Sequence, residues 1–310
     1  MKKVLLATSA FALMAGAASA EISLSGSARM GLIYSDVNGV TTEAFSSRVR
    51  IVFTASGETD TGLSFGASMR ADQDGGNTSG TANGDSTVFI SGAFGKLTMG
   101  DVSGAADALV GQTSGVGYGP NDGLQEISFV GTTKTAAYYE YSTGGFTFGL
   151  GAGQLSSTSD ELNIGVKYST DTYSVALGWE TTDGTAAAPA TFTAAPVSPT
   201  VYAEDLISLG ASAKLGAATL KARVSDSDIN GKDTTWSVSV DYTTGATTLT
   251  AFYTDFGNTI KTVADDTQHV GIGASYDLGG GATVAGGIVQ QLNNVAVDNT
   301  YADVGLKFSF

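Results

Sequence analysis

Apolar and polar residues alternate with a period of two along most of the chain after residue 20, which predicts β-strands with one apolar and one polar face. In residues 21–35, Ile22 and Leu24 fall on the apolar face, whereas Ser25 and Arg29 fall on the polar face. Sixteen segments are predicted as strands, at residues 21–35, 44–56, 62–72, 86–92, 95–101, 134–142, 146–153, 161–169, 172–181, 206–214, 217–225, 234–243, 246–255, 268–277, 281–291 and 301–310. The strand-like run 125–130 is assigned to an insertion, because a single-chain bacterial barrel has an even number of strands.

The connections between these segments alternate between long and short. The long ones are predicted at residues 36–43, 73–85, 101–134, 154–160, 182–205, 226–233, 256–267 and 292–300. Most of the others are tight turns such as Gly144-Gly145 and Thr244-Gly245. This asymmetry is typical of outer-membrane barrels. A soluble β-sandwich also alternates its faces, but the unbroken succession of strands and the terminal strand Lys307-Phe308-Ser309-Phe310 favour an all-β, 16-stranded antiparallel transmembrane β-barrel in a Gram-negative outer membrane.

The insertion at residues 101–134 is rich in glycine, too polar to form a core and too long for a hairpin turn. Barrels of roughly 16 to 18 strands leave an aqueous channel, and the polar faces here carry Ser, Thr, Gly and scattered charges. We therefore expect this third loop to fold into the bore and to restrict what passes. The expected division of the chain is a signal peptide at 1–20 and a barrel at 21–310 that includes the constriction loop at 101–134.

Charged residues on the predicted polar faces indicate how the constriction is built. Four arginines occupy the polar face of three consecutive strands, and a lysine on a later strand extends them. The residues predicted to form the pore constriction are Arg29, Arg48, Arg50, Arg70 and Lys96 on the wall, with Asp101, Asp107, Asp122 and Glu126 supplied by the insertion. Rows of opposite charge across a narrow gap are one way in which pores select. Alternatively, each arginine pairs with a nearby carboxylate to hold the loop against the wall, and we expect both roles.

The first 20 residues have the features of a secretory signal peptide. Lys2 and Lys3 precede an apolar run at 4–15, and Ala18-Ser19-Ala20 forms a small-residue cleavage site. The apolar run is shorter than the roughly 20 residues that a membrane-spanning helix needs. We therefore expect the mature chain to begin at Glu21 and to be exported.

Composition narrows the classes of partner and of chemistry. The chain has no cysteine, which excludes disulfides and thiolate metal sites. Its formal net charge of −15 argues against nucleic acid as a partner. His269 is the only histidine and has no catalytic partner signature around it, so catalysis is not expected.

Calcium is considered at two places. The run Asp72-Gln73-Asp74-Gly75 resembles the start of a calcium loop, but the rest of that pattern is missing, so a solvated turn is favoured. Carboxylates of the outer loops could hold divalent cations that bridge to lipopolysaccharide phosphates, although solvation alone also explains them. These carboxylates are Asp74, Asp85, Asp183, Glu204, Asp205, Asp265 and Asp266. No cofactor is expected to be required.

Several longer motifs together resemble the trimeric 16-stranded general porins of alphaproteobacteria, in particular those of purple photosynthetic bacteria. The motifs that carry the resemblance are LSGSARMG at 24–31, SSRVR at 46–50, GLSFGAS at 62–68, SGAFGKLTMGD at 91–101, GASYDLGGG at 273–281 and DVGLKF at 303–308. The resemblance implies a homotrimer, passive diffusion of small hydrophilic solutes, calcium among loop carboxylates, and closure of the barrel by the Glu21 amino terminus and the Phe310 carboxylate. The insertion departs from that family in being poorer in acidic residues.

A general diffusion porin is therefore the expected function. The alternative is a substrate-selective outer-membrane channel, whose sign would be a line of aromatic side chains along the lumen. Phe252 and Tyr138 are the candidates for such inward aromatics, and their small number favours the general channel. A structural or adhesive barrel is disfavoured, because a plugged barrel would be expected to fill its lumen with larger side chains.

Overall fold

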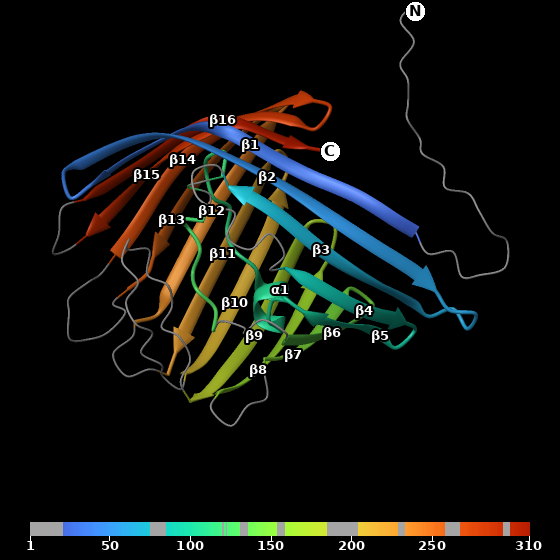
Figure 1. The fold of residues 1–310 in the computed structure, drawn as a ribbon. Coiled ribbons are helices and arrows are strands. Elements are labelled where there is room, and N and C mark those ends of the chain that lie inside the picture. Colours follow the sequence, from blue (N-terminus) through green and yellow to red (C-terminus); the bar gives the residue numbers. More distant parts are fainter. Residues whose placement is uncertain are drawn as a thin grey trace, which may run out of the picture.

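The chain forms one closed antiparallel β-barrel of sixteen strands, which confirms the predicted fold class (Figure 1). The computed structural model describes residues 21–74, 85–119, 121, 123–130, 136–153, 159–184, 204–228, 233–257, 267–293 and 298–310. The strands are β1 (Glu21–Val37), β2 (Val40–Glu58), β3 (Ser64–Asp74), β4 (Ser86–Gly92), β5 (Gly95–Gly100), β6 (Ala136–Thr143), β7 (Phe146–Ala152), β8 (Ser159–Ser169), β9 (Tyr173–Gly184), β10 (Glu204–Leu215), β11 (Ala218–Ser227), β12 (Thr235–Thr244), β13 (Thr247–Asp255), β14 (Thr267–Gly279), β15 (Ala282–Asn293) and β16 (Asn299–Ser309). The predicted signal peptide at 1–20 lies outside the described residues.

The two faces of the strands have the predicted polarity. Large apolar side chains such as Ile22, Val88 and Ile272 are on the outside and are 76%, 61% and 62% exposed. The alternate positions point into the barrel and include buried serines and threonines such as Ser208, Ser237 and Thr254. The sequence alternation therefore encodes an apolar outer surface and a polar lumen, the reverse of a soluble globular protein.

The first connection differs from the prediction of a long loop at residues 36–43. β1 continues to Val37 and β2 begins at Val40, so that Asn38 and Gly39 alone form the turn. Both residues have positive φ, 54° and 78°. This is the conformation of a type I′ hairpin turn, for which Asn-Gly is the preferred pair. The prediction was wrong because this local turn signal outweighed the polar character of the surrounding residues.

The barrel closes between β1 and β16, but not through residue 21. Gly26 donates its N–H to the carbonyl oxygen of Phe310 at 2.6 Å, and the Phe310 N–H donates back to Gly26 at 3.0 Å. Glu21 lies beyond this pair, opposite Ser56 of β2. The register of β1 against β16, in which Arg29 is opposite Lys307, places the end of the chain five residues after Glu21. The expected pairing of Glu21 with Phe310 is therefore replaced by a backbone pair at Gly26.

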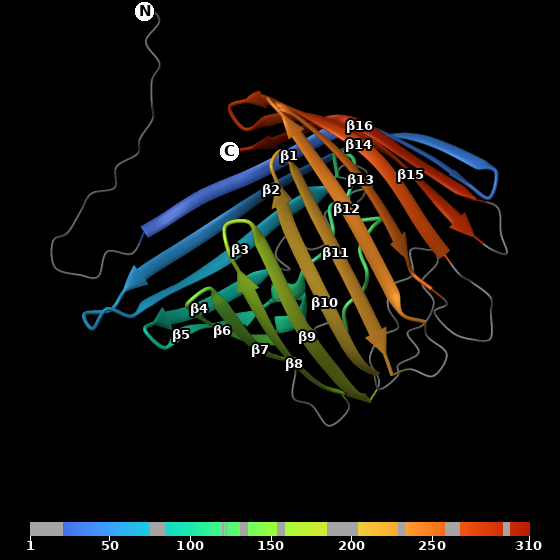
Figure 2. The ribbon, with the colours of Figure 1, turned by 180° about the vertical axis from the view of Figure 1, so that it is seen from behind.

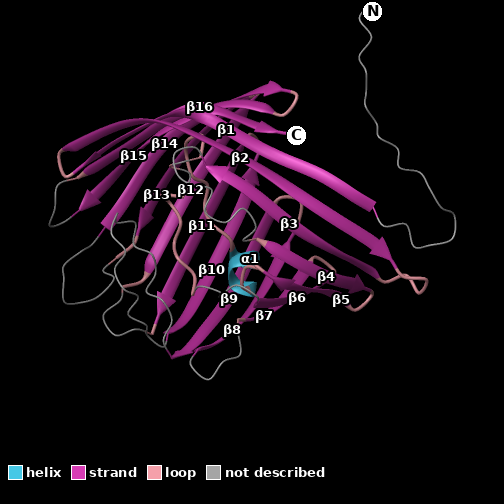
Figure 3. Cartoon of the chain, viewed as in Figure 1, coloured by secondary structure: helices cyan, strands magenta, loops and turns pink. Residues whose placement is uncertain are grey.

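The segment that follows β5 turns into the barrel instead of over its rim. It contains α1 (Ala105–Val110), which lies inside the ring of strands beside β7–β10 (Figures 2 and 3). The described part of the chain contains no helix that is long and apolar enough to cross a membrane.

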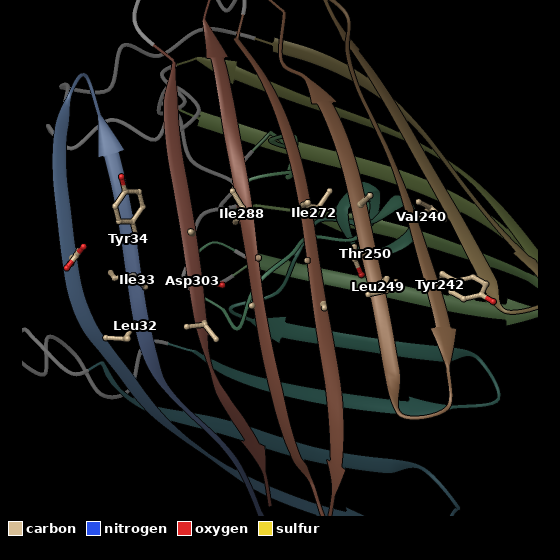
Figure 4. Close-up of a pocket in the computed structure, with 18 residues that line it drawn as sticks. Leu32, Ile33, Tyr34, Val240, Tyr242, Leu249, Thr250, Ile272, Ile288 and Asp303 are labelled. Carbon is tan, nitrogen blue, oxygen red and sulfur yellow. The ribbon is translucent and has the colours of Figure 1, made fainter.

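The wall behind this inward loop, which is formed by β12–β16 and β1, has small residues on both its outer and its inner face. On its outer face an apolar hollow of about 1010 Å³ is lined by small residues, among them Ala274, Gly286 and Ala302, and by larger side chains such as Ile272 and Ile288 (Figure 4). On its inner face, glycines occupy the positions against which the loop packs. At these glycines the inner face of the sheet has no side chain, and residues of the loop cover it.

Candidate pore constriction

Glycines at inward positions of the wall create the surface on which α1 rests. A Cβ added to Gly178 of β9 would lie 2.5 Å from the Ala106 Cβ, and one added to Gly165 of β8 would lie 2.8 Å from the Ala105 carbonyl oxygen. Real Cβ atoms do not approach other atoms this closely. Gly149 of β7 and Gly210 of β10 make similar close approaches to the helix. The glycines therefore form a flat strip that matches the alanine face of α1.

A second group of glycines receives the stretch after the helix. Val116 packs onto Gly273 of β14 and Gly287 of β15, where an added Cβ would lie 2.8 Å from the valine side chain. Tyr118 covers Gly305 of β16 in the same way and is fully buried. The two glycine groups together mark the path of the loop along the inner wall.

Polar side chains of the wall take the place of a neighbouring strand for the backbone of the loop. An irregular segment leaves backbone N–H and C=O groups that must find partners when they are buried. The partners on the wall include Asn163 for the Ala105 N–H, Ser239 for the Ser114 N–H, Asp303 for the N–H groups of Tyr118 and Asn121, His269 for the Leu124 carbonyl and Thr254 for the Gln125 carbonyl. The inward polar residues of β8–β16 thus bind the loop as well as line the lumen.

The strongest of these attachments involves Arg223 of β11 and Glu180 of β9. The Arg223 guanidinium donates to the Ile127 carbonyl at 2.7 Å and the Ser128 carbonyl at 3.2 Å, and it lies 3.5 Å from the centre of the Phe129 ring. Glu180 accepts the next N–H, from Val130, at 3.2 Å. Both charged residues are almost completely buried. Four consecutive loop residues are therefore held by two charged side chains of the wall.

A small apolar cluster completes the contact between loop and wall. It contains Val116 and Leu124 of the loop with Phe252, Val289 and Tyr301 of the wall. Phe252, which the sequence indicated as an inward aromatic, therefore lies buried beneath the loop. Tyr138, the other candidate, points inward and donates its hydroxyl to Glu140 at 2.9 Å.

Two of the predicted arginines are paired with carboxylates of the wall. Arg50 of β2 binds Asp72 of β3 through two guanidinium nitrogens at 3.0 Å. Arg70 bridges Asp72, at 3.1 Å, and Asp85. These four side chains form an alternating row of charges on the inner face near the start of the loop. Asp72 and Asp85, considered from the sequence only as possible calcium ligands, are thus the partners of the basic patch.

The other two arginines meet the loop. Arg29, Arg48 and Glu126 line one cavity of about 300 Å³, together with Tyr118 and Lys307 of β16, which the sequence analysis did not place in the constriction. Glu126 is thus the predicted loop carboxylate that the structure brings to the predicted basic patch.

The remaining predicted residues lie elsewhere. Lys96 extends over the ring of Phe89, with 4.6 Å between the ammonium nitrogen and the ring centre. Asp101 starts the loop and donates its N–H to Ser86 at 2.9 Å. Asp107 is in the first turn of α1, near Glu180 and Arg223. Asp122 lies outside the described residues.

The contacts of residues 105–130 given above join the loop to β7–β16 and β1, and Asp101 joins its start to β4. Within the described residues, no group of three or more histidine, aspartate and glutamate side chains is arranged to hold a metal ion. A closed barrel with an apolar outside, a polar lumen and a loop fixed across the bore defines a membrane channel with an internal constriction.

Comparison with known proteins identifies the family of this channel. The chain matches the model of the Gram-negative porin family over residues 7–296. It is 37% identical to a porin of Rhodobacter capsulatus and 28% identical to a porin of Fuscovulum blasticum, each over 94% of this chain and 100% of the relative. A solved porin structure refined at 1.8 Å superposes with a TM-score of 0.72 at 34% identity, with 94% of this chain and 100% of that chain covered. A variant of the Rh. blastica porin gives a TM-score of 0.72 at 26% identity and the same coverage.

The chain belongs to the Gram-negative porin family. It is an outer-membrane protein that crosses the membrane with many strands and forms a channel for passive diffusion of small hydrophilic solutes.

Proposed function

We propose that this porin is a general channel, which discriminates among small solutes by size and charge and not by binding one of them. The observation that carries this proposal is the fixed loop inside a polar lumen, with Phe252 buried beneath it instead of lining a path for sugars. Liposome swelling with sugars of increasing size tests the proposal. Permeation rates should fall smoothly with solute size, whereas one solute that permeates far faster than others of its size would indicate a selective channel.

We further propose that the constriction is formed by Arg29, Arg48, Arg50, Arg70 and Lys96 with Asp101, Asp107, Asp122 and Glu126. The placement of Glu126 beside Arg29 and Arg48 and the charged row around Asp72 support this proposal. Lys96 and Asp107 lie further from that group, so we assign them a weaker influence on permeating ions.

Neutralising Arg48 and Arg50 is expected to make the channel more cation-selective. Two positive charges leave the lumen wall while Asp72 keeps Arg70 as its partner. The cation-to-anion permeability ratio of an Arg48→Gln/Arg50→Gln variant should rise roughly two- to threefold, because charged side chains at the narrowest point set the local ion concentration. The measurement is the reversal potential under a salt gradient, with Lys167→Gln on β8 as the control. An unchanged reversal potential would exclude these arginines from the constriction.

We propose that the protein works as a homotrimer whose interface includes β4, β5 and β7. These strands have only seven, six and seven residues, and β5 is the shortest strand of the barrel. At a tilt near 40°, a seven-residue strand covers about 18 Å of the roughly 25 Å apolar band. Lipid alone would have to thin considerably on this side. A second copy of the chain covers the exposed side chains there, including Val88 and Met99, without that cost.

Charges placed on these short strands should break the trimer. A Val88→Lys/Met99→Lys variant buries two ammonium groups in the proposed interface and is expected to migrate as a monomer in unheated detergent electrophoresis. Ile272→Lys on the outer hollow is the control, which should lower stability by about 2–4 kcal/mol yet leave the trimer intact. Dissociation caused by Ile272→Lys and not by the double variant would move the interface to β12–β16.

We propose that the channel neither catalyses a reaction nor requires a cofactor. His269, the one available catalytic base, binds the loop through its contact with the Leu124 carbonyl. Lipid and lipopolysaccharide are the proposed partners of the outer surface, with calcium as a possible bridge at loop carboxylates. Of these, Asp85 is engaged with Arg70 and Glu204 with Ser227, whereas Asp265 and Asp266 lie outside the described residues.

Removing divalent cations tests the calcium proposal. Chelation is expected to lower the dissociation temperature of the trimer in detergent, and added calcium is expected to restore it, while single-channel conductance stays the same. Identical melting curves with and without chelator would show that the loop carboxylates are only solvated.

A further inference from the structure

Two oppositely charged side chains are neighbours on the lumen face of β5 and β6. Lys96 of β5 is opposite Glu140 of β6 in the register of the two strands, and the next residue, Leu97, belongs to the apolar outer face. Residues directly opposite one another on one face of a sheet have their Cβ atoms roughly 5 Å apart, which is close enough for a lysine and a glutamate to form an ion pair. The ion pairs of the described part of the chain nevertheless include none between these two residues.

The Lys96 ammonium is held on the side away from β6 by an aromatic ring. It lies 4.6 Å from the centre of the Phe89 ring, and Phe89 is on β4, the other neighbour of β5. The ring itself rests on Gly66 of β3, where an added Cβ would lie 2.6 Å from it. A cation over an aromatic face is attracted by the ring quadrupole. The contact therefore directs the lysine towards β4 and away from Glu140.

The Glu140 carboxylate is held on its other side by a tyrosine of the same strand. Tyr138 donates its hydroxyl to Glu140 Oε2 at 2.9 Å. The tyrosine ring leans towards β7, since a Cβ added to Gly149 of β7 would lie 3.1 Å from Tyr138 Cε2. Gly149 is also the residue opposite Glu140, so no side chain occupies that position. The two charges are therefore directed apart, the lysine towards β4 and the glutamate towards β7.

This pair of charges lies beside the constriction loop. The Cβ that would meet Tyr138 at Gly149 would also lie 3.0 Å from the Leu109 side chain and 3.1 Å from the Ala105 Cβ, both of which belong to α1. Tyr138 and the helix therefore flank the same glycine. A solute that moves through the lumen along this edge of α1 passes the two charges.

Two opposite charges that are held apart match a solute that carries both charges. In a free amino acid the ammonium and carboxylate groups are attached to one carbon atom, and each forms charge-assisted hydrogen bonds with a group of opposite sign. Lys96 can donate to the carboxylate while Glu140 accepts from the ammonium group. An uncharged solute of the same size gains neither contact. Because the pair has no net charge, it acts on zwitterions more than on the balance between cations and anions.

We propose that Lys96 and Glu140 form a weak binding site for zwitterionic solutes of the amino acid class at the edge of the constriction. Phe89 and Tyr138 keep the site open, because each holds one of the two charged groups away from the other. Weak binding raises the concentration of such a solute in the channel and therefore its flux, as long as the solute also leaves readily. The inference rests on the proposed function, since it names a class of solute that the general channel favours.

Swelling of liposomes that contain the purified protein tests this site, with L-alanine and lactamide as probes. The two solutes are isomers, but only alanine is a zwitterion at neutral pH. After subtraction of the rates in liposomes without protein, alanine should enter through the wild type roughly twofold faster than lactamide. In Lys96→Met/Glu140→Gln the two rates should be equal. The exchanged pair Lys96→Glu/Glu140→Lys should keep part of the preference, because a zwitterion can bind in the reverse direction.

Lys167→Gln on β8 is the matched control. It also removes one lysine, but the cross-strand neighbours of Lys167 are Thr147 and Ala176, which carry no charge. The ratio of the two rates should therefore equal that of the wild type.

Equal rates for alanine and lactamide in the wild type would overturn the proposal, and so would a preference that Lys96→Met/Glu140→Gln retains. The wild-type measurement alone gives an answer if a variant does not fold. Sugars distinguish failure of this site from failure of the proposed function. If sugars enter in the order of their size while the two isomers enter equally, the site is absent and the general channel stands. Sugars that do not enter at all would contradict the proposed function itself.

Discussion

Replacing Gly178 and Gly287 by valine is expected to push the loop off the wall and to raise the single-channel conductance roughly twofold, towards that of an open barrel of this strand number. The three atoms nearest to an added Cβ at each of these two positions belong to the loop: Ala106 and Val110 at Gly178, Val116 and Gly117 at Gly287. The strands themselves are not crowded by the change. The loop must therefore move, while the barrel remains closed.

The expected rise in conductance depends on where the valine is introduced and not on the size of its side chain. Leu177→Val changes the outward neighbour of Gly178 on the same strand and should leave the conductance unchanged. Gly305 is a poorer choice, because a Cβ there would also lie 2.5 Å from the Met30 carbonyl oxygen of the wall. A folded Gly178→Val/Gly287→Val trimer with wild-type conductance would show that the loop does not form the narrowest point.

Replacing Arg223 by alanine should destabilise both the loop and the protein. The substitution leaves the carbonyls of Ile127 and Ser128 without their donor and removes the positive charge that faces the buried Glu180 carboxyl. Breaking a buried charged contact from one side costs about 3–5 kcal/mol. We expect a lower free energy of unfolding by about that amount and open-channel current noise from a loop that detaches and returns.

A double variant separates the loss of the hydrogen bonds to the loop from the effect on the buried Glu180. In Arg223→Met/Glu180→Gln the guanidinium and the carboxyl are removed together, so the loss of stability should be smaller than in Arg223→Ala. The current noise should persist, because the two loop carbonyls still lack donors. Equal stability of Arg223→Ala and wild type would show that the loop does not depend on this attachment.

The strands were predictable from the sequence because each carries its own signal. Alternation fixes which residues face outward, and a turn pair such as Gly144-Gly145 fixes where a hairpin ends. The one loop length that was predicted wrongly, at 36–43, contained a local signal as well, the pair Asn38-Gly39. Barrel formation then follows, since the two outermost strands have no other partner.

The attachment of the loop was less predictable, because the hydrogen bonds of residues 105–130 with the wall join residues that are 50 or more positions apart. Nothing near Arg223 indicates that it binds Ile127 and Ser128. The inward glycines are a signal of this attachment that the sequence does contain. Glycine weakens a strand, so glycines on the polar face of several successive strands indicate that another segment packs closely there. Gly149, Gly165, Gly178 and Gly210 form such a series.

The charged residues of the constriction were also predictable only in part. Arg29, Arg48, Arg50 and Arg70 were predictable as inward residues from alternation alone. Their partners were not, because the row of Lys307, Arg29 and Arg48 depends on the register across the closure of the barrel, which no local pattern specifies.

Conductance of the purified protein in a planar bilayer tests the central claim most directly. A trimeric water-filled channel predicts openings in steps of three, a conductance that rises in proportion to potassium chloride concentration, and a reversal potential that reports modest ion selectivity. No conductance in potassium chloride, or a current blocked by micromolar amounts of a single sugar, would contradict the account.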